Sequence, residues 1–347
     1  MAAKQLIQEV DRPRFSDLAA VFDFTAGRDL KTMEQLKDIH LTASGKGAIA
    51  LVLKFLTREG RIADKLDEVL VPDWLGYWVY NQMHTFAFPT KQYSERVKAI
   101  FVYHQYGFPQ NMDAIMQFAK EKNLVVIEDC AHALQSYYRD KLVGYFGDFS
   151  VYSFSKWFFC YALGGVGSKA PGFDDFFQES LKDRHFFLSS FRAGAKLFYE
   201  WARFQSFPSV KRSATYGIRM SYSIYESALR PGRAAVNLLE QKLPEEIALR
   251  KRRYEYFLRE TAGRELRRGL EEKGITPYLI PVFGIRAALE KLVQSLRDIG
   301  IATGIHNFDS ARNLLSPRYE LCVPLPCHSG MSDAQFEKMI TLVKKNL

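Results

Sequence analysis

A single lysine, Lys156, lies in a run of aromatic, small and hydroxyl-bearing residues, Ser150–Phe159. A glycine pair, Gly164 and Gly165, follows this run. The run predicts a β-strand that ends close to the lysine. Burial disfavours an ammonium group, so a lysine in these surroundings would present neutral amine, the form that attacks a carbonyl carbon to make a Schiff base. The alternative is an ordinary lysine at a strand end, whose stem packs while its ammonium reaches water.

A carboxylate stands at the end of a second apolar run, Leu124–Asp129, which predicts a buried strand. Asp129 leaves that strand and could hold a cationic nitrogen of a ligand, with His132 near the same point. The alternative is an aspartate that caps the following helix.

A third candidate is the sequence Ser44-Gly45-Lys46-Gly47, which precedes a long apolar stretch. Ser44 is a good N-cap, and the apolar stretch predicts a buried helix. The N–H groups at such a helix start bind phosphate readily, and Lys46 would add positive charge. The spacing differs from that of a Walker A loop, and a capped core helix without a ligand is the alternative.

Strands and helices alternate along this part of the chain. The segments are a strand that runs into an aromatic turn and a helix, a second strand, an amphipathic helix and a third strand: Glu68–Trp78, Lys98–His104, Met112–Lys120 and Leu124–Asp129. This order predicts an α/β fold with a mostly parallel, doubly wound sheet. Ligands bind at the carboxyl ends of the strands in such sheets, where Asp129 and Lys156 would meet.

The chain divides by pattern into two predicted domains. Residues 1–233 would form the large domain, and residues 234–347 a smaller α+β domain. The smaller one contains a predicted strand, Tyr278–Phe283, then a helix, Ala287–Ile299, and a final helix from Ser332.

Within the large domain, residues 173–226 change character, because basic and aromatic residues are mixed there. The set is Lys182, Arg184, Phe186, Phe187, Phe191, Arg192, Lys196, Phe198, Tyr199, Trp201, Arg203, Phe204, Phe207, Lys211 and Arg212. Such a mixture occurs in membrane-surface helices and nucleic-acid faces. No regular basic stripe emerges, so a helical pair that covers the core or a dimer partner is favoured, without nucleic acid or membrane insertion.

Composition is that of an ordinary globular protein. The 347 residues are 47% hydrophobic and 25% charged, with a formal net charge of +9, which favours anionic partners such as phosphorylated metabolites. The N-terminal residues lack the apolar region of a secretory signal. The cysteines Cys130, Cys160, Cys322 and Cys327 show no metal-binding spacing and indicate reduced thiols in the cytoplasm.

Several motifs together resemble one known family, the DegT/StrS-type sugar aminotransferases among the fold-type I pyridoxal phosphate (PLP) enzymes. The resemblance runs from about Leu41 to the C-terminus. Its carriers are Thr42–Ala48, Val71-Pro72, His104–Pro109 with Met112-Asp113, Val126–Ala133, Gly144–Asp148, Ser153–Lys156, Gly164-Gly165, Gly300–His306 and Leu325-Pro326.

The resemblance implies roles for the chemical residues. Lys156 would form a Schiff base with pyridoxal 5'-phosphate and act as the general base once a donor displaces it. Asp129 would keep the pyridine nitrogen protonated, so that the ring acts as an electron sink. His306 falls where the family has a histidine facing the substrate.

The resemblance also implies how the cofactor is held. Gly45, Lys46 and the Ser153 hydroxyl would bind its phosphate, and His132 would lie near its ring. The stacking aromatic residue of the family aligns with Gly76, so Tyr77, or else Trp78, would replace it through a shifted turn.

The resemblance implies an enzyme that transfers an amino group from an amino acid, with glutamate as first choice, to a keto-sugar, most simply a nucleotide-linked one. It also implies a homodimer. The alternatives are another PLP reaction, such as a lyase, a dehydratase or transamination of a non-sugar ketone, and a non-catalytic regulatory relative. Sugar dehydratases of the family carry histidine in place of the lysine, so Lys156 argues against that branch.

Overall fold

The computed structural model describes residues 7–11, 13–14, 17, 36–181, 186–202, 205, 207–225, 230–267, 270 and 274–347. A seven-stranded sheet has the order β1 (Ile39–Thr42), β9 (Gly164–Ser168), β8 (Phe149–Ser153), β5 (Val125–Asp129), β4 (Val97–Tyr103), β2 (Glu68–Leu70) and β3 (Phe88–Thr90). β3, β2, β4, β5 and β8 pair in parallel, whereas β9 is antiparallel to β8 and β1. The predicted mostly parallel sheet is confirmed.

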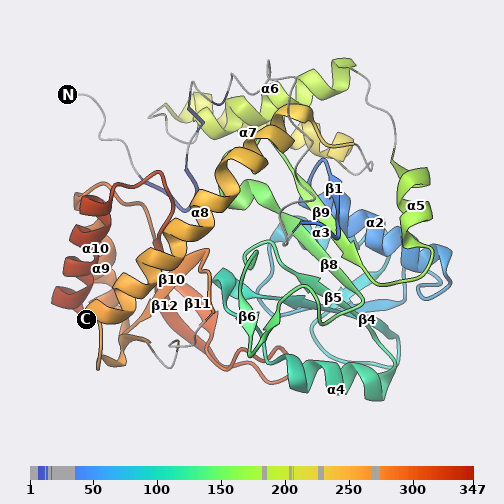
Figure 1. Ribbon diagram of the computed structural model, residues 1–347, viewed down its shortest axis with the longest axis horizontal. Coiled ribbons are helices and arrows are strands. Elements are labelled where there is room, and N and C mark those ends of the chain that lie inside the picture. The colour runs from blue at the N-terminus through green and yellow to red at the C-terminus, as the bar shows by residue number, and fades with distance from the viewer. Residues whose placement is uncertain are drawn as a thin grey trace.

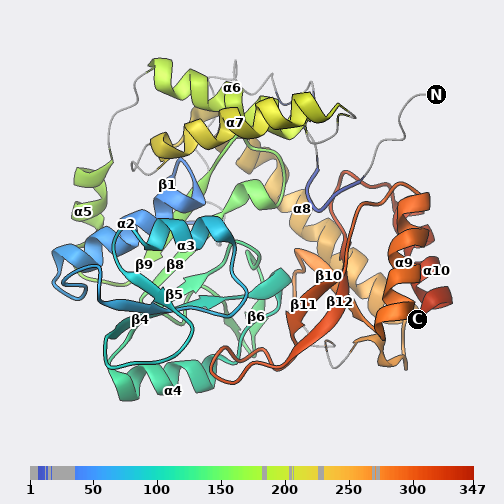
Figure 2. The ribbon, with the colours of Figure 1, turned by 180° about the vertical axis from the view of Figure 1, so that it is seen from behind.

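Helices cover both faces of this sheet (Figures 1 and 2). Alternate residues of β4 point to opposite faces: Phe101 packs in a core with α2 (Gly45–Arg58) and α5 (Phe173–Ser180), and Ile100 packs in a core with α4 (Met112–Lys122). A fully buried side chain of this kind contributes about 1.5–3 kcal/mol. Burial on both faces explains why the strand is apolar throughout.

A second, antiparallel sheet has the order β10 (Leu279–Phe283), β12 (Tyr319–Pro326) and β11 (His306–Asp309), flanked by α9 (Arg286–Asp298) and α10 (Asp333–Asn346). The long helix α8 (Arg233–Glu260) runs diagonally from near α7 across to the small sheet (Figure 1). The remaining elements are α3 (Tyr77–Met83), the hairpin β6 (Tyr137–Tyr138) and β7 (Lys141–Leu142), and three short 3-10 helices, η2 (Gln105–Gly107), η3 (Phe154–Lys156) and η4 (Glu265–Arg267).

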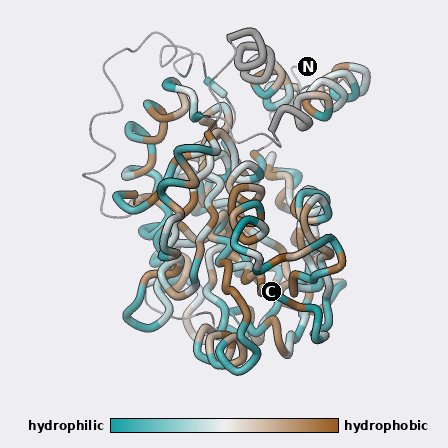
Figure 3. Tube along the Cα trace, turned by 90° about the vertical axis from the view of Figure 1, so that its right-hand side faces the viewer, coloured by the Kyte–Doolittle hydropathy of each residue, from teal (hydrophilic) through white to brown (hydrophobic). Residues whose placement is uncertain are grey.

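The aromatic and basic segment contains α5 and a helical hairpin, α6 (Phe186–Ala202) and α7 (Pro208–Tyr225), which lies over one end of the large sheet (Figures 1 and 2). Lys182, Arg184, Arg203 and Phe204 lie outside the described residues, as do the side chains of residues 186–193 and 221–225. Among the other described helices, turns carry both hydrophilic and hydrophobic residues (Figure 3), as expected of helices that bury one face.

The division into domains at residue 233 remains a proposal. The start of α8 at Arg233 supports it, since the large sheet lies before this point and the small sheet after it. The N-terminal segment does not follow the division, because Ile7 pairs with Ile301 beside the small sheet. Among the described residues, none of the helices combines the length and apolar character that crossing a membrane requires.

Candidate active site

A cavity of about 440 Å³ lies at the carboxyl ends of the parallel strands. Tyr103, Asp129 and Ser153, the last residues of β4, β5 and β8, all line it. Open α/β sheets bind ligands at this edge, where neighbouring strand ends converge. Six of the residues predicted from sequence line this cavity: Gly45, Lys46, Asp129, His132, Ser153 and Lys156.

The N-terminus of α2 forms one end of the cavity. The Ser44 side chain caps the helix by accepting a hydrogen bond from the Gly47 N–H at 3.1 Å. A Cβ atom on Gly45 would lie 2.8 Å from Ser153 Cβ, and one on Gly164 would collide with the Gly45 nitrogen. Glycine at both positions therefore lets α2 approach β8 and β9 closely, with the N–H groups of its first turn at the cavity.

Two side chains from this end also meet. The Lys46 Nζ lies 4.1 Å from the centroid of the Trp78 ring, a cation–π contact. Trp78 lines the cavity, whereas Tyr77 does not and is 70% exposed. The shifted turn thus brings Trp78 to the cavity rather than Tyr77.

Asp129 is buried at the end of β5 and lines the cavity. Within the described part of the chain, its carboxylate accepts one hydrogen bond, from the Ala131 N–H to Oδ1 at 3.0 Å. Burial raises the pKa of Asp129 to about 6, although that hydrogen bond and nearby positive charge act in the opposite direction. A cationic group beside this carboxylate would offset the cost of burying its charge.

His132 is fixed on two sides. Its Nδ1 shares a hydrogen bond of 2.7 Å with the Tyr103 hydroxyl, and its ring stacks on Tyr278 with centroids 4.0 Å apart. Burial, together with the positive charges of Lys156 and Arg250, holds the pKa of His132 well below its usual range. The cavity therefore has a neutral imidazole beside Lys156.

Lys156 ends η3, directly after β8, and its side chain is exposed within the cavity. The sequence predicted a buried amine, and this expectation is wrong for the chain alone. The surroundings of the lysine are nevertheless rigid, because Trp157 is fully buried and its indole N–H donates to the Ala131 carbonyl at 3.0 Å.

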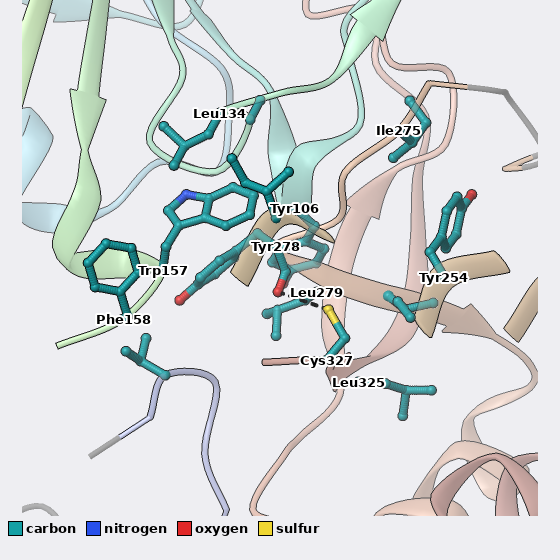
Figure 4. Packing of buried hydrophobic residues seen from close by; sticks show 14 of the residues in the cluster. Tyr106, Leu134, Trp157, Phe158, Tyr254, Ile275, Tyr278, Leu279, Leu325 and Cys327 are labelled. Carbon is teal, nitrogen blue, oxygen red and sulfur yellow. Dashed lines mark hydrogen bonds between the residues drawn. The ribbon is translucent and has the colours of Figure 1, made fainter. Parts of the chain in front are cut away.

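A buried guanidinium supports this loop from behind. Arg250 of α8 donates to the carbonyl oxygens of Trp157 at 3.2 Å and Tyr278 at 2.6 Å, and it pairs with Glu246 at 2.6 Å. It also lies 4.7 Å from the centroid of the Trp157 ring. Trp157 and Tyr278 lie side by side where the two sheets meet (Figure 4).

His306 does not reach the cavity. It is exposed, and its Nδ1 shares a hydrogen bond of 2.8 Å with the hydroxyl of Tyr106. Tyr106 in turn lies stacked 6.1 Å from His132. His306 therefore connects to the site only through a second ring.

Sequence reasoning missed several residues at the site. Glu9 of the N-terminal segment, Tyr103 of β4, and Lys196, Tyr199 and Glu200 of α6 line the cavity. The three α6 residues follow an i, i+3, i+4 spacing, which indicates that their side chains share one face of the helix. Nothing in the local pattern around Glu9 placed it there.

A separate polar cluster lies beneath the site. The buried Glu128 accepts hydrogen bonds from the backbone N–H groups of Gly144, Phe146 and Gly147 and contacts the His104 Nε2 at 3.2 Å. The Gln110 N–H donates to the other His104 nitrogen, so Nε2 carries the proton and donates to Glu128. Ligand atoms of His104, Glu128 and Cys130 lie within 4.8 Å of one another, but hydrogen bonds already occupy both nitrogens of His104.

Residues 90–166, which include Asp129, His132 and Lys156, match the model of the DegT/DnrJ/EryC1/StrS aminotransferase family. Over these residues the chain is similar to that family. The predicted fold-type I architecture is also confirmed: a Streptococcus pneumoniae protein assigned as a sugar aminotransferase, solved in its PMP form, superposes with a TM-score of 0.66 at 17% identity over 100% of both chains.

Two curated relatives show how far the similarity to the family extends in sequence. GDP-perosamine synthase of Escherichia coli is 51% identical over 61 residues, 18% of this chain and 17% of that protein. The dTDP-4-dehydro-2,6-dideoxy-D-glucose 3-dehydratase of Saccharopolyspora spinosa is 30% identical over 178 residues, 43% of this chain and 38% of that protein. The matches thus span less than half of each relative's length.

Proposed function

We propose that the chain is a PLP-dependent aminotransferase, which transfers an amino group from an amino acid, with glutamate as first candidate, to a nucleotide-linked keto-sugar. The observation that carries the proposal is a single cavity lined by an amine, Lys156, a buried carboxylate, Asp129, and the N-terminus of a glycine-containing helix. The match of residues 90–166 to the aminotransferase family model and the similarity to a relative named GDP-perosamine synthase support the acceptor class.

The residues present fit pyridoxal phosphate. Asp129 is a buried carboxylate with a single hydrogen bond from the described residues, so a protonated ring nitrogen would complete its surroundings. The first turn of α2, Lys46 and the Ser153 hydroxyl would hold the phosphate. Lys156 would hold the aldehyde carbon, and Trp78 would replace Tyr77 as the aromatic residue near the ring.

When bound, the cofactor supplies an electron sink for the substrate carbon that loses a proton. Asp129 would keep the ring nitrogen protonated, because the negative charge of the ionised carboxylate favours the cation. Once a donor amine displaces it, the Lys156 amine, which is exposed to the cavity, could take the proton from the substrate carbon and return it to the carbon on the other side of the bridging nitrogen. His132 remains neutral and adds no second positive charge beside that amine.

A dehydratase is the alternative that a relative favours, since the Saccharopolyspora spinosa protein carries that name. Dehydratases of the family have a histidine at the lysine position. Lys156 in the cavity therefore supports amino transfer.

The visible absorption spectrum of the purified protein with PLP, recorded before and after glutamate, tests the proposal. We expect a visible band from the cofactor held by Lys156, which glutamate converts into the absorption of the aminated cofactor. A persistent band indifferent to glutamate would point to another donor or another PLP reaction. The absence of any band would favour a non-catalytic relative.

We also propose a cytoplasmic homodimer. Buried, unpaired cysteines at all four positions suit a reducing compartment. Exposed apolar side chains on α6 (Trp201), directly before α7 (Phe207) and on α7 (Met220) suit a subunit contact. Light scattering coupled to size-exclusion chromatography would measure the mass, and a monomer at micromolar concentration would contradict the dimer.

A further inference from the structure

One face of α6 forms a wall of the active-site cavity. Lys196, Tyr199 and Glu200 follow the i, i+3, i+4 spacing that places side chains on one helical face, and all three line the cavity. Ile218 of α7 also lines it. The segment that the sequence left without a role therefore reaches the place where a substrate must bind.

Two of these residues form a largely buried ion pair. Lys196 Nζ lies 2.5 Å from Glu200 Oε1, and the side chains are 18% and 9% exposed. Burying two charges costs desolvation free energy, so a buried ion pair by itself contributes little to the stability of the fold. An ammonium group donates several hydrogen bonds and a carboxylate accepts several, so the pair brings both donors and acceptors to the cavity wall.

The charges that line the cavity fall into two groups. Lys46, Asp129 and Lys156 are accounted for by the proposed cofactor, which leaves Glu9, Lys196 and Glu200 among the described residues. This remainder is a mixture of donors and acceptors without net positive charge. A diphosphate group prefers clustered donors and positive charge, whereas hydroxyl groups both donate and accept.

We propose that the Lys196–Glu200 pair binds the hydroxyl-bearing sugar ring of the acceptor, and not its nucleotide diphosphate. The inference rests on the proposed function, and it assigns the sugar end of that substrate to α6. The α6–α7 hairpin is then a wall that selects the sugar.

Calorimetric titration of the PLP-loaded chain tests this, with GDP, dTDP and UDP as probes, each free and each linked to a keto-hexose. One of the nucleotide-linked sugars should bind the wild type. We expect the Glu200→Gln variant to bind that same compound about tenfold more weakly, because one charged hydrogen bond is lost. The corresponding free nucleotide should bind equally to both. Glu179→Gln and Lys211→Met, which alter exposed residues of α5 and α7, are matched controls.

Thermal melting shows whether the variant is folded. If Glu200→Gln unfolds, the double variant Lys196→Met with Glu200→Met, which leaves neither charge unpaired, replaces it and should lose the same selectivity. Equal weakening for free and linked nucleotides would overturn the inference, as would unchanged binding of the linked sugar. A wild type that forms the visible band but binds no linked sugar would overturn it as well, whereas the absence of the band would contradict the proposed function itself.

Discussion

The guanidinium of Arg250 donates a hydrogen bond across 3.2 Å to the carbonyl oxygen of Trp157, the residue that follows Lys156. The same group donates to the carbonyl of Tyr278, whose ring stacks on His132. One buried cation of α8 therefore holds both the lysine loop and the ring behind His132.

Replacing Arg250 by methionine should lower the free energy of unfolding by about 3–5 kcal/mol, because Glu246 would be left as a buried unpaired charge. The double variant Arg250→Met with Glu246→Leu removes that charge and should recover most of the stability, as measured by urea denaturation. It should still capture PLP roughly tenfold more slowly, since the Trp157 carbonyl loses its donor.

The rate at which the visible band forms after PLP addition measures that capture. Arg252→Met, at the exposed neighbouring position, is the control. A double variant that recovers both stability and normal capture would show that Arg250 has only a structural role.

Lys156→Ala should abolish the visible band and turnover while the melting temperature stays within about 2 °C of the wild type. The side chain is exposed, so its loss removes little packing. Lys120→Ala, at an exposed position of α4, should change neither property. Retention of turnover in Lys156→Ala would refute the role of this lysine.

The stability of the cofactor-free protein should depend on Asp129. Because burial raises the pKa of Asp129 to about 6 from its ordinary value of 3.8, the folded state binds a proton more tightly than the unfolded state between these values. The free energy of unfolding should therefore fall as the pH rises from about 4 to about 6, by up to roughly 3 kcal/mol from this group.

Denaturation curves of Asp129→Asn across that range should lack this decline, whereas Asp140→Asn, at an exposed position, should retain it. The same Asp129 variant should turn over roughly 100-fold more slowly, because an amide cannot hold the ring nitrogen protonated. Parallel pH profiles for the wild type and Asp129→Asn would contradict the assignment.

Gly45→Ala should lower stability by about 1–3 kcal/mol and weaken PLP binding, since the new Cβ would lie 2.8 Å from Ser153 Cβ at the start of α2. Gly217→Ala is the matched change in the middle of α7, where a Cβ meets no atom within 4 Å. It should raise stability by about 0.5–1 kcal/mol. Equal effects of the two substitutions on urea midpoints would argue against close packing at Gly45.

The sequence was most informative where function follows from position along a strand. Asp129 and Ser153 end neighbouring strands, and parallel strands bring their ends to one edge, so their meeting at one cavity could be predicted. Gly45 and Lys46 could be predicted for a similar reason, because a helix start is visible as a cap followed by an apolar run.

The remaining site residues depend on tertiary contacts between distant segments. Tyr278, the residue before β10, stacks on His132, and Glu9 comes from a segment in which Ile7 pairs with Ile301. The hydrophobic periodicity of a single segment gives no information about such long-range contacts. Tyr77 and Trp78 differ by one position on a short helix, so which of them turns to the cavity depended on a turn that residue types alone do not specify.

The order in which these parts are synthesised follows from their positions. Among the described residues, those that line the cavity lie from Glu9 to Ile218, whereas Arg250 and Tyr278 come later in the chain. A nascent chain in which Tyr278 has not yet emerged from the ribosome has the strand ends and α2 but lacks the ring behind His132. Full support of His132 and of the lysine loop is therefore expected only once Arg250 and Tyr278 have both emerged, after every described residue that lines the cavity.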